Sequence, residues 1–110
     1  METSAAEKVE ARRSHRFAVE QVVALRSLDG LFDDTCGTSR DVSACGLFFY
    51  ADDELPVGAA VELFMMMPDT GTLLHDIFPL RAYGAVVRTE RHETRFGIAV
   101  AFEKVEVLAE

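Results

Sequence analysis

Apolar residues alternate with other residues along most of this chain, and that period of two restricts the fold more than any other feature. In residues 95–103 every second position is large and apolar: Phe96, Ile98, Val100 and Phe102. Successive side chains of a strand point to opposite faces, whereas an amphipathic helix needs apolar residues three and four positions apart. Helical spacing is weak throughout, so the sequence predicts a β protein with little helix, confined to the ends of the chain.

Turn and loop residues divide the pattern into six segments. The predicted strands cover residues 16–26, 35–40, 47–51, 60–67, 79–91 and 95–103, and 27–34, 52–58 and 69–76 are expected to be loops. Gln21 interrupts the apolar face of the first strand, which predicts a bulge or the polar wall of a pocket. Short strands at close spacing favour a compact antiparallel barrel or sandwich.

Length and composition indicate one domain. The chain has 110 residues, of which 49% are hydrophobic, enough for one core. We expect a flexible N-terminal segment at residues 1–10, the domain at 11–104, and a C-terminal tail or short helix at 105–110. No apolar run approaches the ~20 residues of a membrane span, and residues 1–10 lack the apolar centre of a signal peptide. The expected location is the cytoplasm.

The cysteines and histidines do not indicate a metal site. Cys36 and Cys45 are expected to be free thiols, and the three histidines are scattered along the chain with no CxxC motif. No nucleophile elbow accompanies them, so neither metal chemistry nor a hydrolase triad is expected, and we predict that the protein is not an enzyme.

Charge is distributed unevenly. Residues 8–16 contain four cations and one anion, a local sum of +3 in a chain whose net charge is −8, so the remainder sums to −11. A duplex binder needs a broad cationic face, which this acidic body lacks. A small anion with one or two phosphates needs only a few arginines. The charge map therefore favours a small ligand over a nucleic acid polymer.

A second stretch, SRDVSACG at residues 39–46, carries the complementary chemistry. Asp41 and Ser43 alternate and are expected on one face, and Gly46 follows where a side chain would crowd that face or where φ must be positive. A carboxylate can accept from the adjacent N1–H and 2-amino groups of guanine, and arginine complements O6 and N7 on its other edge. Together the two stretches contain the groups needed to hold a guanine nucleotide.

These two stretches resemble the motifs of PilZ domains. Residues 12–16, RRSHR, match the RxxxR element, and residues 41–46, DVSACG, match the [D/N]xSxxG element. LPVGAAVEL at 55–63 and RFGIAVAFE at 95–103 are similar to the fourth and last strands of the family. The resemblance covers roughly residues 12–103. It implies a six-stranded antiparallel β-barrel that binds cyclic di-GMP, a bacterial second messenger, without catalysis or a cofactor.

The resemblance also implies roles for the arginines. Arg12 and Arg16 would grip guanine edges and phosphates, and Arg13 would add a phosphate contact or stacking. Without ligand, this basic arm is expected to be flexible, since like charges repel and no apolar anchor precedes Phe17.

In the second motif, Asp41 would accept from the guanine N1–H and 2-amino group. Ser43 would bond the base or a phosphate, and Gly46 would leave room for the ligand. Cys45 stands where many members of the family have glycine, which puts only the shape of the loop in question.

Two readings of function follow. In the first, the protein is a cyclic di-GMP receptor that passes messenger binding to a downstream protein partner, as a monomer or a homodimer. In the second, it is a protein-interaction adaptor that keeps the barrel and has lost the ligand, as in some type IV pilus members of the family. The intact motifs favour the first. Taken alone, residues 11–17 would be read as a solvated basic arm.

Overall fold

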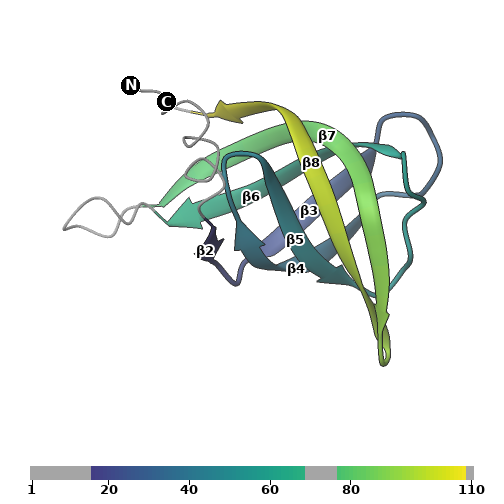
Figure 1. Ribbon diagram of the computed structural model, residues 1–110. Helices are drawn as coiled ribbons and strands as arrows, with labels where there is room; N and C mark the ends of the chain where they lie inside the picture. The colour runs from purple at the N-terminus through teal and green to yellow at the C-terminus, as the bar shows by residue number, and fades with distance from the viewer. Residues whose placement is uncertain (1–15, 69–76, 109–110) are drawn as a thin grey trace, which may run out of the picture.

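The computed structural model describes residues 16–68 and 77–108, which form seven strands and no helix (Figure 1). The strands are β2 (Phe17–Ala18), β3 (Val22–Ser27), β4 (Thr35–Val42), β5 (Gly46–Ala51), β6 (Ala60–Pro68), β7 (Ile77–His92) and β8 (Arg95–Val107). Within these ranges there is no helix long and apolar enough to cross a membrane.

Six of these strands close into a barrel. Every pairing is antiparallel, in the order β4-β3-β6-β7-β8-β5, and β5 pairs back to β4. The short β2 adds to β4 beside β3. The predicted all-β, six-stranded antiparallel barrel is confirmed.

Apolar side chains at alternating strand positions fill the inside of the barrel. The inward positions are almost wholly buried: Val23 and Leu25 on β3, Leu47 and Phe49 on β5, Val61, Leu63 and Met65 on β6, Leu80, Ala82 and Val86 on β7, and Ile98 and Val100 on β8. Leu55, from the loop between β5 and β6, is also buried in this core. Since the interior is packed with side chains, a ligand must bind on the outer face or at an end.

The first predicted strand is broken at the position where its apolar face is interrupted. Residues 19–21 leave the ladder between β2 and β3. The Ser39 hydroxyl, on β4, donates to the Val19 carbonyl and accepts from the Gln21 N–H at 2.9 Å. The Ser39 N–H donates to the Gln21 carbonyl at 2.8 Å. A buried serine therefore satisfies the backbone where the strand is interrupted.

The C-terminal boundary differs from the prediction. We expected a tail or helical turn from Val105, but β8 continues to Val107, where it pairs with Leu80 on β7. The extension has partners within the strand predicted at 79–91, since Val105 and Glu106 pair with Ala82 and Arg81. The predicted N-terminal segment 1–10, the predicted loop 69–76 and residues 109–110 lie outside the described residues.

Candidate functional site

A β-bulge places two adjacent charged residues together on the outside of β4. Ser39 pairs with Phe49 on β5 and Asp41 pairs with Phe48, so Arg40 is an extra residue in the ladder. Ser39 and Val42 are buried, while Arg40 is exposed and Asp41 is partly exposed. In a regular strand Arg40 and Asp41 would point to opposite faces. Because of the bulge, the side chains of both residues lie on the outer face of the barrel.

Asp41 is bracketed by two arginines. Arg16 Nε donates to Oδ1 of the carboxylate, and Arg40 Nε donates to Oδ2 at 2.7 Å. The Asp41 side chain is only 15% exposed. Burial raises the pKa of Asp41, but the hydrogen bonds from Arg40 and Arg16 outweigh it and hold the pKa below its ordinary value. The carboxylate is therefore ionised throughout the neutral range.

An aromatic ring forms the floor beside this ion cluster. The Arg40 guanidinium carbon lies 4.0 Å from the centroid of the Phe48 ring, and that of Arg88, on β7, lies 5.7 Å from it. Phe48 points outward from β5, yet it is only 2% exposed because its neighbours cover it. A Cβ at Gly97 would lie 2.5 Å from Phe48 Cζ, so the ring needs that glycine on β8. The Phe48 ring therefore provides a flat apolar surface on which the guanidinium groups of Arg40 and Arg88 rest.

The serine and glycine of the second motif build the hairpin between β4 and β5. The Ser43 hydroxyl accepts from the Cys45 N–H at 3.1 Å, and the Ser43 N–H donates to the Gly46 carbonyl at 2.8 Å. A Cβ on Gly46 would lie 2.5 Å from the Val100 carbonyl oxygen on β8. The space beside Gly46 is thus taken by the barrel itself. The expectation that Gly46 leaves room for a ligand is not needed to account for it, and its φ is not positive.

The structure brings Arg16 and Asp41 into contact, although they are 25 residues apart. It places Ser43 and Gly46 at the adjacent hairpin. The predicted ligand residues Arg12 and Arg13 lie outside the described residues.

Sequence reasoning missed Arg40, Phe48 and Arg88. Arg40 directly precedes Asp41, but only the bulge puts it on the same face, and the alternation gives no sign of a bulge there. Phe48 is an aromatic residue on the outward side of a strand, which is a weak signal for a binding surface. Among the residues that the structure describes, no three His, Cys, Asp or Glu side chains gather to hold a metal ion.

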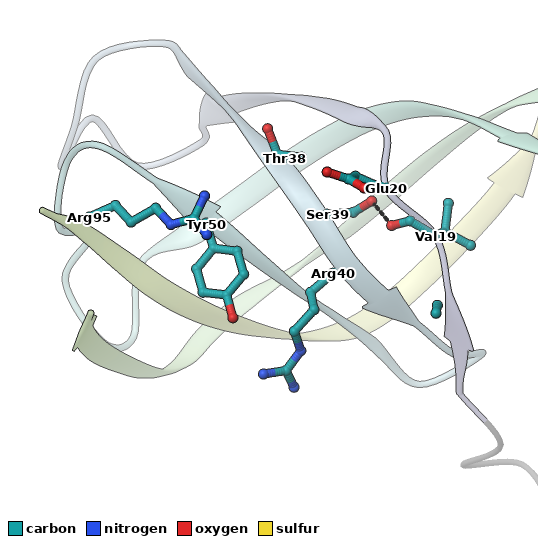
Figure 2. Close-up of a pocket in the computed structure, with 8 residues that line it drawn as sticks. Val19, Glu20, Thr38, Ser39, Arg40, Tyr50 and Arg95 are labelled. Carbon is teal, nitrogen blue, oxygen red and sulfur yellow. Dashed lines mark hydrogen bonds between the residues drawn. The ribbon is translucent and has the colours of Figure 1, made fainter. Parts of the chain in front are cut away.

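A pocket adjoins the Arg40–Asp41 cluster on the same outer face. It has a volume of about 370 Å³, within the range of roughly 300–1,000 Å³ usual for small-molecule sites. Figure 2 shows Arg95 extending toward Tyr50 on one side of β4 and Glu20 on the other side, with Thr38 and Arg40 on β4 between them. The pocket is therefore lined by charged and aromatic groups.

The barrel and the charged outer face define a small, all-β binding domain. The chain matches the family model for the PilZ domain over residues 10–110, which is nearly its whole length. The protein belongs to the PilZ domain family, whose members are binding and adaptor domains and which is known for binding cyclic di-GMP. The resemblance seen in the sequence is confirmed. None of the curated proteins matches the chain significantly.

Proposed function

We propose that this protein is a bacterial cyclic di-GMP receptor that acts in the cytoplasm, and that it works by binding and not by catalysis. The observation that carries the proposal is the Asp41 carboxylate, held on the outer face between Arg16 and Arg40 above the ring of Phe48. Membership of the PilZ family supports it.

Asp41 keeps acceptor capacity for a base. A carboxylate has about four lone-pair positions, and each of its oxygens already accepts from one arginine. One further position remains on each oxygen, which suits the adjacent N1–H and 2-amino donors of guanine. The surrounding guanidinium groups would supply cations for the O6 and N7 acceptors and the phosphates of the ligand.

The output of binding is proposed to involve the N-terminal arm. Arg16 is the first described residue and already contacts Asp41. Arg12 and Arg13, which precede it, would join the ligand's phosphates and guanine edges. Ligand binding would then fix the arm relative to the barrel and alter the surface presented to a protein partner.

The direct test is calorimetric titration of the full chain with cyclic di-GMP. We expect micromolar or tighter binding by the parent and a loss of at least tenfold in Asp41→Asn, which keeps the shape of the side chain but replaces an acceptor with a donor. Asp53→Asn removes a carboxylate from the loop between β5 and β6 and serves as the control, with unchanged affinity. No heat of binding from the parent up to high micromolar ligand rejects the receptor and favours the adaptor.

A further inference from the structure

The pocket beside Arg40 repeats the chemistry of the Asp41 cluster. At Asp41, a carboxylate, two arginines and an aromatic ring lie together, with the Arg40 guanidinium 4.0 Å from the centroid of Phe48. In the pocket, the Arg95 guanidinium also lies 4.0 Å from the centroid of an aromatic ring, that of Tyr50, and Glu20 supplies a carboxylate. Arg40 lines the pocket as well, so it adjoins both sets of groups.

The Tyr50 ring is held in place by its neighbours. It packs edge to face against Phe48 at 5.5 Å between centroids and against His92 on β7 at the same distance. Arg95 lies over this fixed ring and presents a flat cationic surface to the pocket. Arginine planes that rest on aromatic rings are favourable surfaces for stacking a nucleobase.

The two sets adjoin each other on the outer face, with the ring centroids of Phe48 and Tyr50 5.5 Å apart. Asp41 pairs with Phe48, and Tyr50 is two residues further along β5, a separation of about 7 Å along the strand. The Arg40 guanidinium, from the bulge between Ser39 and Asp41, lies over Phe48 and also lines the pocket, so it belongs to both sets.

We propose that this pocket is a second purine subsite, in which Arg95 and Tyr50 stack the second guanine of cyclic di-GMP and Glu20 accepts from its N1–H and 2-amino group. The inference rests on the proposed function, since Asp41 is taken to hold the first guanine. The ligand has two identical halves, and each half would meet a carboxylate, at least one arginine and an aromatic ring.

The test compares cyclic di-GMP with the mixed dinucleotide cyclic GMP–AMP, each titrated into the full chain. With its guanine at Asp41, the mixed ligand places adenine in the pocket, and adenine lacks the N1–H and 2-amino donors that Glu20 would accept. We expect the parent to prefer cyclic di-GMP by roughly tenfold or more, and Glu20→Gln to bring the two affinities to within about threefold. Asp41→Asn should weaken both ligands to a similar extent.

Arg95→Ala tests the stacking surface, and we expect both ligands to bind about tenfold more weakly. Arg91→Ala, an exposed arginine that lies over Phe96 and does not line the pocket, and Glu54→Gln, in the loop between β5 and β6, are the matched controls and should bind like the parent. If the parent binds cyclic di-GMP while Glu20→Gln and Arg95→Ala retain both its affinity and its preference, the second subsite is wrong and the receptor function stands. If the parent binds neither ligand, the receptor function itself fails, and the subsite with it.

Discussion

Replacing Gly46 with alanine separates the structural role of the second motif from its role in binding. The new Cβ would lie 2.5 Å from the Val100 carbonyl oxygen, whereas ordinary carbon–oxygen contacts across a sheet are about 3.3–3.6 Å. The backbone must therefore shift by about 1 Å. The contacted oxygen is a backbone atom of a continuous ladder, with Gly46 opposite Ala101 and Leu47 opposite Val100, so no flexible side chain can move aside.

The cost follows from that displacement. Forcing extra volume into a packed region typically costs about 1–3 kcal/mol, and we expect a value near 2 kcal/mol for Gly46→Ala. In a domain of this size each kcal/mol corresponds to roughly 4–8 °C, so the melting temperature should fall by roughly 10 °C. The measurement is urea unfolding followed by circular dichroism, with the slope of the transition checked against the parent.

Two comparisons make the result decisive. Gly30→Ala has no atom within 4 Å of the new Cβ and is strained only by its φ of +77°, so it reports backbone strain without the clash. Titration of folded Gly46→Ala with cyclic di-GMP should give an affinity within about threefold of the parent, since Gly46 contributes space to the barrel and not to the ligand. A variant as stable as the parent to within ~0.5 kcal/mol, but with tenfold weaker binding, would overturn this reasoning.

The remaining predictions concern the ion cluster. Arg16→Ala and Arg12→Ala should each lower the affinity for cyclic di-GMP about tenfold to a hundredfold, as measured by titration. Melting should show that each changes stability by no more than about 0.5 kcal/mol. If both variants bind with parental affinity, the arm is only a solvated tail. Arg40→Ala should weaken binding about tenfold and destabilise the fold by less than about 1 kcal/mol, because its side chain is 51% exposed and the pair with Asp41 is screened. The lowered pKa of Asp41 means that its pairs with the arginines stabilise the fold above the ordinary carboxyl range, near 3.9, and that this contribution is lost as pH falls through the lower folded value. Titrations should therefore give a constant affinity from pH 7 to 5 and weaker binding only below about pH 4, and a loss between pH 7 and 5 would contradict the assignment.

Alternation was sufficient to predict the barrel strands because it reports directly which side chains are buried. Residues 95–103 showed the pattern most clearly, and Ile98 and Val100 are in the core. The end of the same strand could not be predicted from its own residues, because β8 continues to Val107 only where β7 provides a pairing partner. Strand ends depend on neighbours that are distant in sequence.

The candidate site was likewise predictable from the sequence only in part. Arg16 and Asp41 were both assigned to the ligand site from their chemistry and from the family motifs, but the direct contact between them was not predicted. The contribution of Arg40 was hidden, since in a regular strand it points away from Asp41. The structural role of Gly46 was also hidden, because the atom that an added Cβ would meet is the carbonyl oxygen of Val100, on the opposite strand of the ladder.

The packed interior explains why the bulge matters for binding. A filled barrel must hold its ligand on the outside with long side chains, and each arginine that becomes ordered on binding costs about 0.5–1.5 kcal/mol. Arg40 is already held before ligand arrives, by the Asp41 carboxylate at 2.7 Å and by the Phe48 ring at 4.0 Å. The hydrogen bond to Asp41 is also the main reason that the pKa of Arg40 is raised. A single extra residue in β4 thus supplies a preordered cation beside the base-reading carboxylate, which lowers the cost of binding on an exposed surface.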